Sequence, residues 1–131
     1  MRFELSEQKF EHIKIERVEE GNYAVISINR PAKLNALQNK TLKEIADAFE
    51  LMELDKSVRC VVLRGTKDFI KKPAFSAGAD LSGRGAPEID RANLMDQSHL
   101  MYIRHKSYAL IEKFPKLIIA AVDGYALGGG F

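Results

Sequence analysis

The chain has 131 residues, of which 46% are hydrophobic and 29% charged, and its formal net charge at pH 7 is +2. The size fits one domain, and the composition excludes a disordered or collagenous chain. So small a charge, spread along the whole sequence, gives no reason to expect a nucleic-acid partner. Cys60 is the only cysteine, which excludes an internal disulfide or a cysteine-built zinc site and favours a reducing, cytoplasmic location.

Apolar runs in the sequence are short. The longest, residues 117–122, is far below the roughly twenty residues that a membrane helix needs. Residues 1–11 mix charged with apolar side chains and contain no signal-peptide core. We therefore expect no membrane partner.

The first half of the chain predicts a strand pair followed by a helix. Residues 12–18 and 23–29 alternate apolar with polar side chains around a polar turn, as in a β-hairpin or two adjacent strands. Residues 39–55 have apolar side chains at helical spacing, and Thr41 with Glu44 three positions later matches a capping box. Residues 58–64 then read as a buried strand.

The second half predicts a further helix and strand. A polar connection at residues 67–73 leads to the short stretch 74–76, and residues 82–87, with two glycines and a proline, indicate a loop. A helical pattern runs from about residue 90 to Phe114, where Pro115 stops it. Residues 117–122 form a third apolar run, predicted as a buried strand.

This order of elements favours an α/β layered domain with at least some parallel strand pairing. The sequence stops at Phe131, directly after three glycines that resemble a turn into a helix. A strand without its following helix leaves an apolar face uncovered. We therefore expect the chain to be a fragment.

Two glycine-containing turns follow short apolar stretches, at residues 77–81 and 124–130. Glycine permits close backbone approach, so such turns can direct free N–H groups at a ligand oxygen, although each turn alone is also consistent with a tight connection. The second turn has neither the Lys-Ser/Thr pair of a P-loop nor the Gly-x-Gly-x-x-Gly pattern. The sequence therefore argues against an ATPase or a dinucleotide-dependent oxidoreductase.

Three blocks of the sequence resemble the signature blocks of the enoyl-CoA hydratase/isomerase (crotonase) family. They are Asn-Arg-Pro-Ala-Lys-Leu-Asn-Ala-Leu at residues 29–37, Ala-Phe-Ser-Ala-Gly-Ala-Asp-Leu at 74–81, and Ile-Ala-Ala-Val-Asp-Gly-Tyr-Ala-Leu-Gly-Gly-Gly at 119–130. The resemblance covers residues 13–131, with the blocks in the order of the family. It implies a crotonase-like spiral of ββα units, incomplete at the C-terminus, with residues 1–131 as the N-terminal portion of an acyl-CoA-binding domain.

The resemblance also implies the partners. The substrate would be an acyl-CoA thioester, no cofactor is needed because coenzyme A is part of the substrate, and the full-length protein would be a homotrimer or hexamer. In this family two main-chain N–H groups bind the thioester oxygen, and the matching positions are Ala79 and Gly129. Preorganised donors of this kind stabilise the negative charge that develops on that oxygen in the transition state.

Further substrate contacts follow from the same resemblance, which places them at Lys33, Ala36, Ala77, Gly78, Asp80 and Leu81. Lys33 is a candidate for the coenzyme A phosphates, and Arg30, Lys71 and Lys72 are weaker ones. A solvated lysine is an equally good interpretation of Lys33 and a better one for the others.

Other ionisable residues have simpler interpretations. Asp80 could be a general base, but its place between a turn and a possible helix start favours an N-cap. His12 falls in the first predicted strand, and His99 and His105 are six positions apart, so no metal site is expected. Cys60 lies in an apolar run and reads as an inert core residue.

The expected reaction is that of an enoyl-CoA hydratase-like lyase, which adds water across a trans-2-enoyl-CoA. Such a reaction needs an acid/base pair. In the hydratases of the family this pair is two glutamates that follow the glycine triplet, so they do not fall within these 131 residues. An enoyl-CoA isomerase or acyl-CoA hydrolase of the same family, a catalytically inert fragment that acts only in binding or assembly, and an unrelated small α/β ligand-binding domain remain open alternatives.

Overall fold

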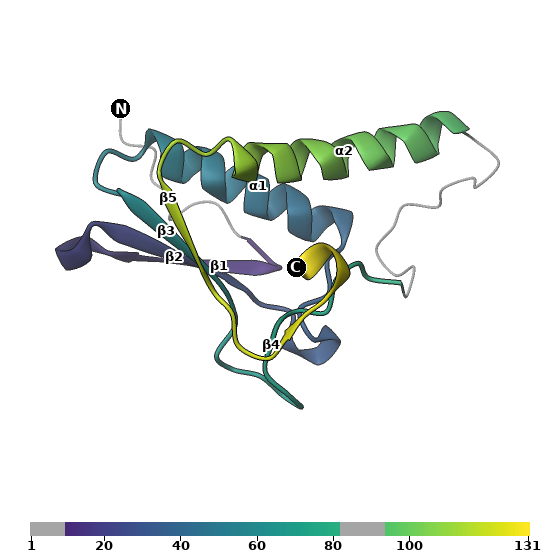
Figure 1. Ribbon diagram of the computed structural model, residues 1–131, viewed down its shortest axis with the longest axis horizontal. Coiled ribbons are helices and arrows are strands. Elements are labelled where there is room, and N and C mark those ends of the chain that lie inside the picture. The colour runs from purple at the N-terminus through teal and green to yellow at the C-terminus, as the bar shows by residue number, and fades with distance from the viewer. Residues whose placement is uncertain (1–9, 82–93) are drawn as a thin grey trace.

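The structure is a computed structural model that describes residues 10–81 and 94–131. Two helices, α1 (Asn39–Leu54) and α2 (Leu94–Glu112), pack side by side over one face of a four-stranded sheet (Figure 1). The strands lie in the order β1 (Ile13–Val18), β2 (Tyr23–Ile28), β3 (Cys60–Gly65) and β5 (Leu117–Ala121). β1 and β2 are antiparallel, whereas β2, β3 and β5 are parallel, which confirms the predicted strand pair and layered α/β fold.

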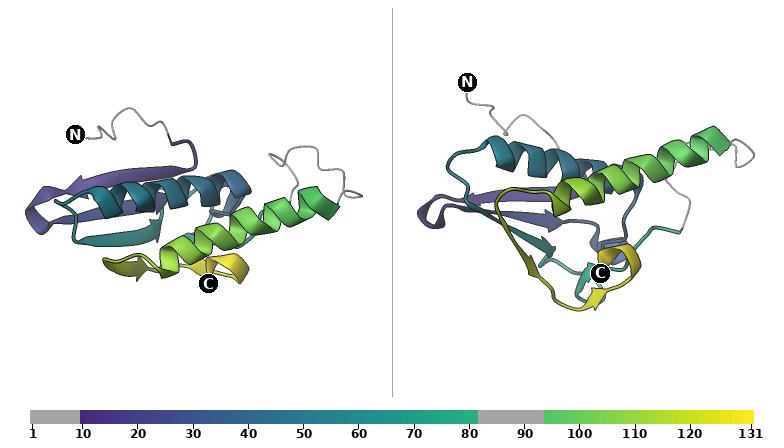
Figure 2. Two further views of the ribbon diagram at one scale, coloured as in Figure 1. Left: turned by 90° about the horizontal axis from the view of Figure 1, so that it is seen from above. Right: turned by 45° about the horizontal axis from the view of Figure 1, so that its top comes forward.

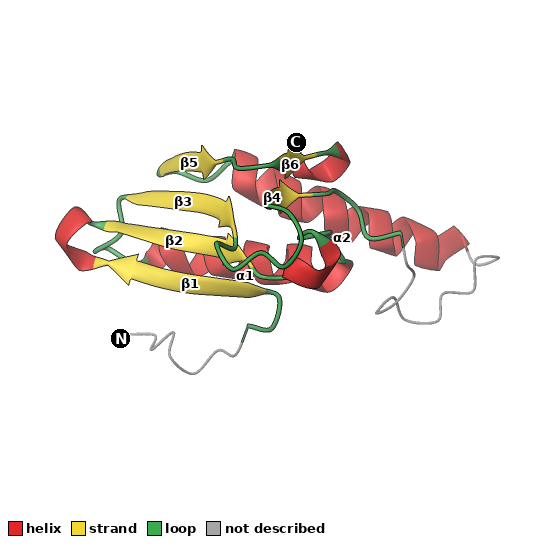
Figure 3. Cartoon of the chain, turned by 90° about the horizontal axis from the view of Figure 1, so that it is seen from below, coloured by secondary structure: helices red, strands yellow, loops and turns green. Residues whose placement is uncertain are grey.

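A second, smaller sheet pairs β4 (Ala74–Ser76) with β6 (Tyr125–Ala126) in parallel. It lies beyond the carboxyl ends of β2 and β3 (Figure 3). The chain therefore runs β1–β2–α1, then β3–β4–α2, then β5–β6. This order is the repeat of ββα units that the family resemblance implies. Three 3-10 turns complete the described elements: η2 (Glu19–Gly21), η3 (Pro31–Lys33) and η4 (Gly128–Gly130).

The hydrophobic core lies between the sheet and the helices. Figure 2 shows these two layers from two further directions. Strand β2 buries every second side chain, and α1 buries residues at helical spacing. The Phe49 ring of α1 meets Phe114, just after α2, edge to face with 5.0 Å between ring centres. Removing this apolar surface from water drives the two layers together.

Helix α1 begins at residue 39, as predicted, but its capping differs from the prediction. Gln38 is the N-cap, and Thr41 lies inside the first turn, where its hydroxyl accepts the Gln38 N–H at 3.2 Å. Glu44 is not the partner of Thr41; its buried carboxylate accepts the backbone N–H groups of Glu11 at 3.0 Å and His12 at 2.7 Å. The predicted Thr41–Glu44 capping box is therefore wrong, because Gln38 and Thr41 form the capping box and Glu44 bonds the segment before β1.

Strand β5 also differs from its predicted burial. Leu117 is 73% exposed and Ile119 is 54% exposed. Among the described residues β5 is the outermost strand of the sheet, with β3 as its only neighbour. The apolar run 117–122 thus forms a strand as expected, but the covering layer that would bury it is not among these residues. The predicted loop 82–87 and the predicted helix start near residue 90 lie outside the described residues.

Candidate functional site

The loops that follow β4 and β6 come together beside the small sheet. The Leu127 N–H donates to the Ser76 carbonyl at 3.0 Å, and Gly130 packs against the Ser76 side chain. Gly78 has a φ of +92°, and a Cβ at this position would lie 2.6 Å from the Leu127 carbonyl oxygen. Only glycine therefore allows this close approach of the two loops.

The two predicted N–H donors lie on these loops. On either side of Ala79, the Gly78 carbonyl accepts the Leu37 N–H at 2.7 Å, and the Asp80 N–H donates to the Leu37 carbonyl at 2.9 Å. The N–H of Ala79 points away from Leu37, because the backbone polar groups of successive residues in an extended segment point to opposite sides. Within residues 10–81 and 94–131, neither the Ala79 nor the Gly129 N–H has a hydrogen-bond acceptor, and both residues are exposed. The site therefore offers two main-chain donors to an external acceptor.

The carbonyl of Gly129 accepts a hydrogen bond from a side chain of α2. The Tyr108 hydroxyl of α2 donates to it at 3.2 Å. The same hydroxyl would lie 2.5 Å from a Cβ at position 129. The Gly129 carbonyl and the Gly130 N–H belong to one planar peptide unit. The bond from Tyr108 therefore restricts the local conformation of the glycine triplet.

The predicted coenzyme A segment lies next to the Ala79 loop. Leu34 and Asn35 have φ values of 51° and 55°, which turn the chain back so that Leu37 pairs with Ala79. The Ala77 N–H donates to the Leu34 carbonyl at 3.0 Å. The structure therefore brings Ala36, Ala77 and Gly78 together with Ala79. At the margins of this group, Lys33 has an exposed side chain and Leu81 is 94% exposed.

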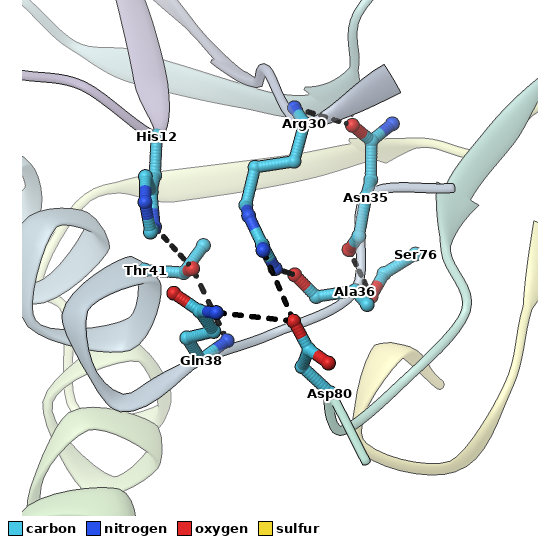
Figure 4. A network of polar contacts seen from close by, with 8 residues as sticks. All are labelled: His12, Arg30, Asn35, Ala36, Gln38, Thr41, Ser76 and Asp80. Atoms are coloured by element: carbon cyan, nitrogen blue, oxygen red, sulfur yellow. Dashed lines mark hydrogen bonds and ion pairs between the residues drawn. The ribbon is translucent and has the colours of Figure 1, made fainter. Parts of the chain in front are cut away.

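Arg30, a weaker candidate for the coenzyme A phosphates, is bonded within the protein. Its side chain is only 11% exposed, and its guanidinium lies 3.0 Å from the Asp80 carboxylate and also donates to the Ala36 carbonyl (Figure 4). Asp80 in turn accepts the Gln38 side-chain amide at 3.2 Å. Its carboxylate thus bonds residues that precede it in the chain, and whether it caps a helix in 82–93 lies outside the described residues. Lys71 and Lys72 are exposed, as the simpler interpretation expects.

Two buried polar residues that the sequence analysis did not single out connect these segments. The Asn35 side chain accepts the Arg30 N–H at 2.9 Å and donates to the Ala74 carbonyl at 2.7 Å. The Ser76 hydroxyl donates to the Asn35 carbonyl at 2.8 Å and accepts the Gly78 N–H at 3.1 Å. The signal for Asn35 was its place in a turn, since asparagine tolerates positive φ. Nothing in the sequence marks Ser76 as buried.

His12 lies just before β1, at the edge of this network (Figure 4). Its Nδ1 is 2.7 Å from the Thr41 hydroxyl. Partial burial, followed by the positive charge of Arg30, lowers the pKa of the imidazole below its ordinary value. The neutral imidazole is therefore favoured in the folded chain.

The part of the chain that the structure describes has neither a metal-binding cluster nor a membrane-spanning helix. No group of three or more His, Cys, Asp or Glu side chains there is arranged to hold a metal ion. None of the helices in residues 10–81 and 94–131 has the length and apolar character needed to cross a membrane.

The fold and the glycine-lined loops define a domain of the crotonase type, and comparison with known proteins agrees. Residues 18–131 match the enoyl-CoA hydratase/isomerase family. The chain therefore belongs to this family.

Curated relatives include a short-chain-enoyl-CoA hydratase from Clostridium acetobutylicum, 39% identical over 85% of this chain and 39% of that protein. A crotonyl-CoA hydratase from Syntrophomonas wolfei is 36% identical over 92% of this chain and 42% of that protein. Among solved structures, an enoyl-CoA hydratase/isomerase from Xanthobacter autotrophicus is 31% identical with a TM-score of 0.79, over 93% of this chain and 42% of that one. The chain thus spans about two fifths of the length of these relatives.

Proposed function

We propose that this chain forms the thioester-binding part of an enoyl-CoA hydratase, a lyase that adds water across a trans-2-enoyl-CoA. In this proposal the Ala79 and Gly129 N–H groups donate to the thioester oxygen. The observation that carries it is the convergence of two glycine-lined loops, each with a main-chain N–H that has no acceptor in the described residues. The names of the curated relatives support the choice of reaction.

The chemistry follows from the charge on the thioester oxygen. Addition of water to an enoyl thioester passes through an enolate-like state, in which this oxygen gains negative charge. Two fixed N–H donors stabilise that charge more than they stabilise the neutral ground state, and therefore lower the barrier. Loss of one such donor costs roughly 10²- to 10³-fold in rate.

The rest of the substrate would lie along the neighbouring segments. We assign coenzyme A contacts to Lys33, Ala36, Ala77, Gly78 and Leu81, which line or flank the Ala79 loop. The reaction would need no cofactor, because coenzyme A arrives as part of the substrate. We further propose a homotrimer or hexamer for the full-length protein, and a cytoplasmic location, which the single cysteine supports.

A titration with crotonyl-CoA tests this function. We expect the 131-residue chain to bind crotonyl-CoA, with changes in the NMR signals of the Ala79 and Gly129 amides. We expect no hydration, followed as loss of the absorbance of the conjugated thioester, because the acid/base glutamates known in the family are not in this segment. No binding, or binding that leaves both amide signals unchanged, would contradict the proposal.

Gly78 and Gly128 provide a matched pair of variants for the same site. Both have positive φ, but a Cβ at Gly78 would meet the Leu127 carbonyl at 2.6 Å, whereas at Gly128 the nearest atom is 3.9 Å away. Gly78→Ala should therefore separate the loops and weaken crotonyl-CoA binding at least tenfold. Gly128→Ala should cost only the strain of the left-handed backbone, about 1 kcal/mol of stability. Equal affinities of the two variants in calorimetric titration would argue against loop contact at Gly78.

A further inference from the structure

The backbone on both sides of Ala79 is bonded to Leu37. The Gly78 carbonyl and the Asp80 N–H bond the two polar backbone groups of Leu37. These bonds fix the direction of the Ala79 N–H relative to Leu37. The Leu37 segment is also joined to the end of β2 by a main-chain bond, from the Asn35 N–H to the Arg30 carbonyl at 2.9 Å. The segment that contains Asp80 is connected directly to Arg30 through side chains.

One little-exposed ion pair supplies this connection. The side chains of Arg30 and Asp80 are 11% and 6% exposed, and their charged atoms are 3.0 Å apart. Arg30 follows β2, and Asp80 follows Ala79 directly in the sequence. Because the pair is shielded from water, its charges interact more strongly than those of a surface pair.

Both members of the pair also bond the segment assigned to coenzyme A. The Arg30 guanidinium donates to the Ala36 carbonyl, and the Asp80 carboxylate accepts the Gln38 side-chain amide. Figure 4 shows Arg30 extending from the end of β2 toward both Ala36 and Asp80. The pair therefore links the segment that would bind coenzyme A to the loop that would bind its thioester oxygen.

We propose that Arg30 and Asp80 are positioning residues, which place the Ala79 N–H at the correct distance from bound coenzyme A to meet the thioester oxygen. The inference rests on the proposed function. It assigns to Asp80 a role through the neighbouring backbone rather than a direct contact with substrate. A main-chain donor cannot be removed by side-chain substitution, so this ion pair is one means by which the sequence controls it.

The test compares butyryl-CoA with S-butyl-CoA, a thioether that lacks the carbonyl oxygen. We expect the wild-type chain to bind the thioester about tenfold more tightly, the size expected for one to two net hydrogen bonds. Asp80→Asn and Arg30→Met should reduce this preference below threefold, with thioether affinity within twofold of wild type. Arg30→Lys, which keeps the charge, should retain part of the preference.

Arg17→Met is the matched control, because Arg17 of β1 forms a 2.8 Å pair with Asp55 at the C-cap of α1, outside the residues assigned to the site. It should keep the full preference. Circular dichroism checks folding, and if Arg30→Met does not fold, the near-isosteric Asp80→Asn decides. Two results would overturn the positioning role without affecting the proposed function. One is a tenfold preference for the thioester retained in Asp80→Asn, and the other is a loss of thioether affinity as large as the loss of thioester affinity. Equal binding of the two ligands by the wild-type chain overturns the proposed thioester contact and, with it, this inference.

Discussion

At the scale of single residues, the site depends on polar side chains that are buried and fully bonded. Asn35 is 2% exposed and has a φ of +55°. Its side chain bonds backbone groups of Arg30 and Ala74, and its carbonyl accepts the Ser76 hydroxyl. Because each lost partner leaves a buried group unsatisfied, such residues contribute to stability as well as to the geometry of the loops.

Asn35→Ala tests this contribution. The variant leaves the Arg30 N–H and the Ala74 carbonyl without their partner and puts alanine in a left-handed backbone conformation. We expect a loss of about 2–4 kcal/mol in the free energy of unfolding, measured by urea denaturation. Asn29→Ala is the control, since the Asn29 side chain makes no hydrogen bond within the described residues. A loss below about 1 kcal/mol for Asn35→Ala would contradict this account.

The lowered pKa of His12 predicts that the stability of the chain depends on pH. Burial and Arg30 lower its pKa in the folded chain, so between that value and the ordinary 6.5 the unfolded chain binds more protons. The contribution of His12 is therefore present above pH 6.5 and decreases as the pH falls below it. The drop in Tm between pH 7.5 and 5.5 should be smaller in His12→Gln than in wild type. His105→Gln, at an exposed position in α2, should show the wild-type drop.

At the scale of elements, one lysine connects the end of α1 to the start of β5. The Lys116 ammonium donates to the carbonyls of Met52 at 2.6 Å and Asp55 at 2.7 Å. These carbonyls lie in the last turn of α1 and at its C-cap, where the helix has unsatisfied acceptors and partial negative charge. The bond stabilises the helix end and orients the strand that leads to the glycine triplet.

Lys116→Met should therefore lower the free energy of unfolding by about 1–2 kcal/mol. Methionine keeps most of the apolar length of lysine and removes the donor. Thermal unfolding of the variant and of Lys113→Met, an exposed position after α2, makes the comparison. Similar Tm values for the two variants would mean that the Lys116 bonds do not contribute.

The elements were predictable to the extent that their signals are local. Hydrophobic alternation identified β1 and β2, and helical spacing identified α1, because both patterns reflect burial against one neighbour. The pairing of β4 with β6 was not predicted, since strands this short have no periodicity to read. The Arg30–Asp80 pair was missed for a related reason: ion pairing between residues about fifty positions apart leaves no pattern in sequence. Ala79 and Gly129 were predicted as donors only through resemblance to a family, because a main-chain donor has no side chain to mark it.

At the scale of the whole molecule, apolar side chains of β5 and the C-terminal segment lie on the surface. Leu117 and Ile119 on β5 and Leu127 beyond it are each more than half exposed. β5 is also an outer strand of the sheet as described, so its backbone polar groups have one unpaired side. Exposed apolar edges of this kind favour association with other chains.

We therefore expect the purified chain to self-associate at high concentration. Ile119→Lys should shift sedimentation velocity profiles toward the monomer, because a charge on the outer strand disfavours edge contact. Met101→Lys is the control: Met101 is 50% exposed but lies on α2, in the helical layer rather than on the sheet. A wild-type chain that remains monomeric at all concentrations would contradict this expectation.

The parallel pairing of β4 with β6 joins segments about fifty residues apart in the chain. Closing a loop of that length costs conformational entropy before any contact repays it, so this small sheet should form late in folding. A partly folded chain that has only the β1–β2 hairpin and α1 would have no converging glycine loops. Only completely folded molecules would then bind the ligand. Bound acyl-thioesters would therefore slow global unfolding rather than loop opening alone.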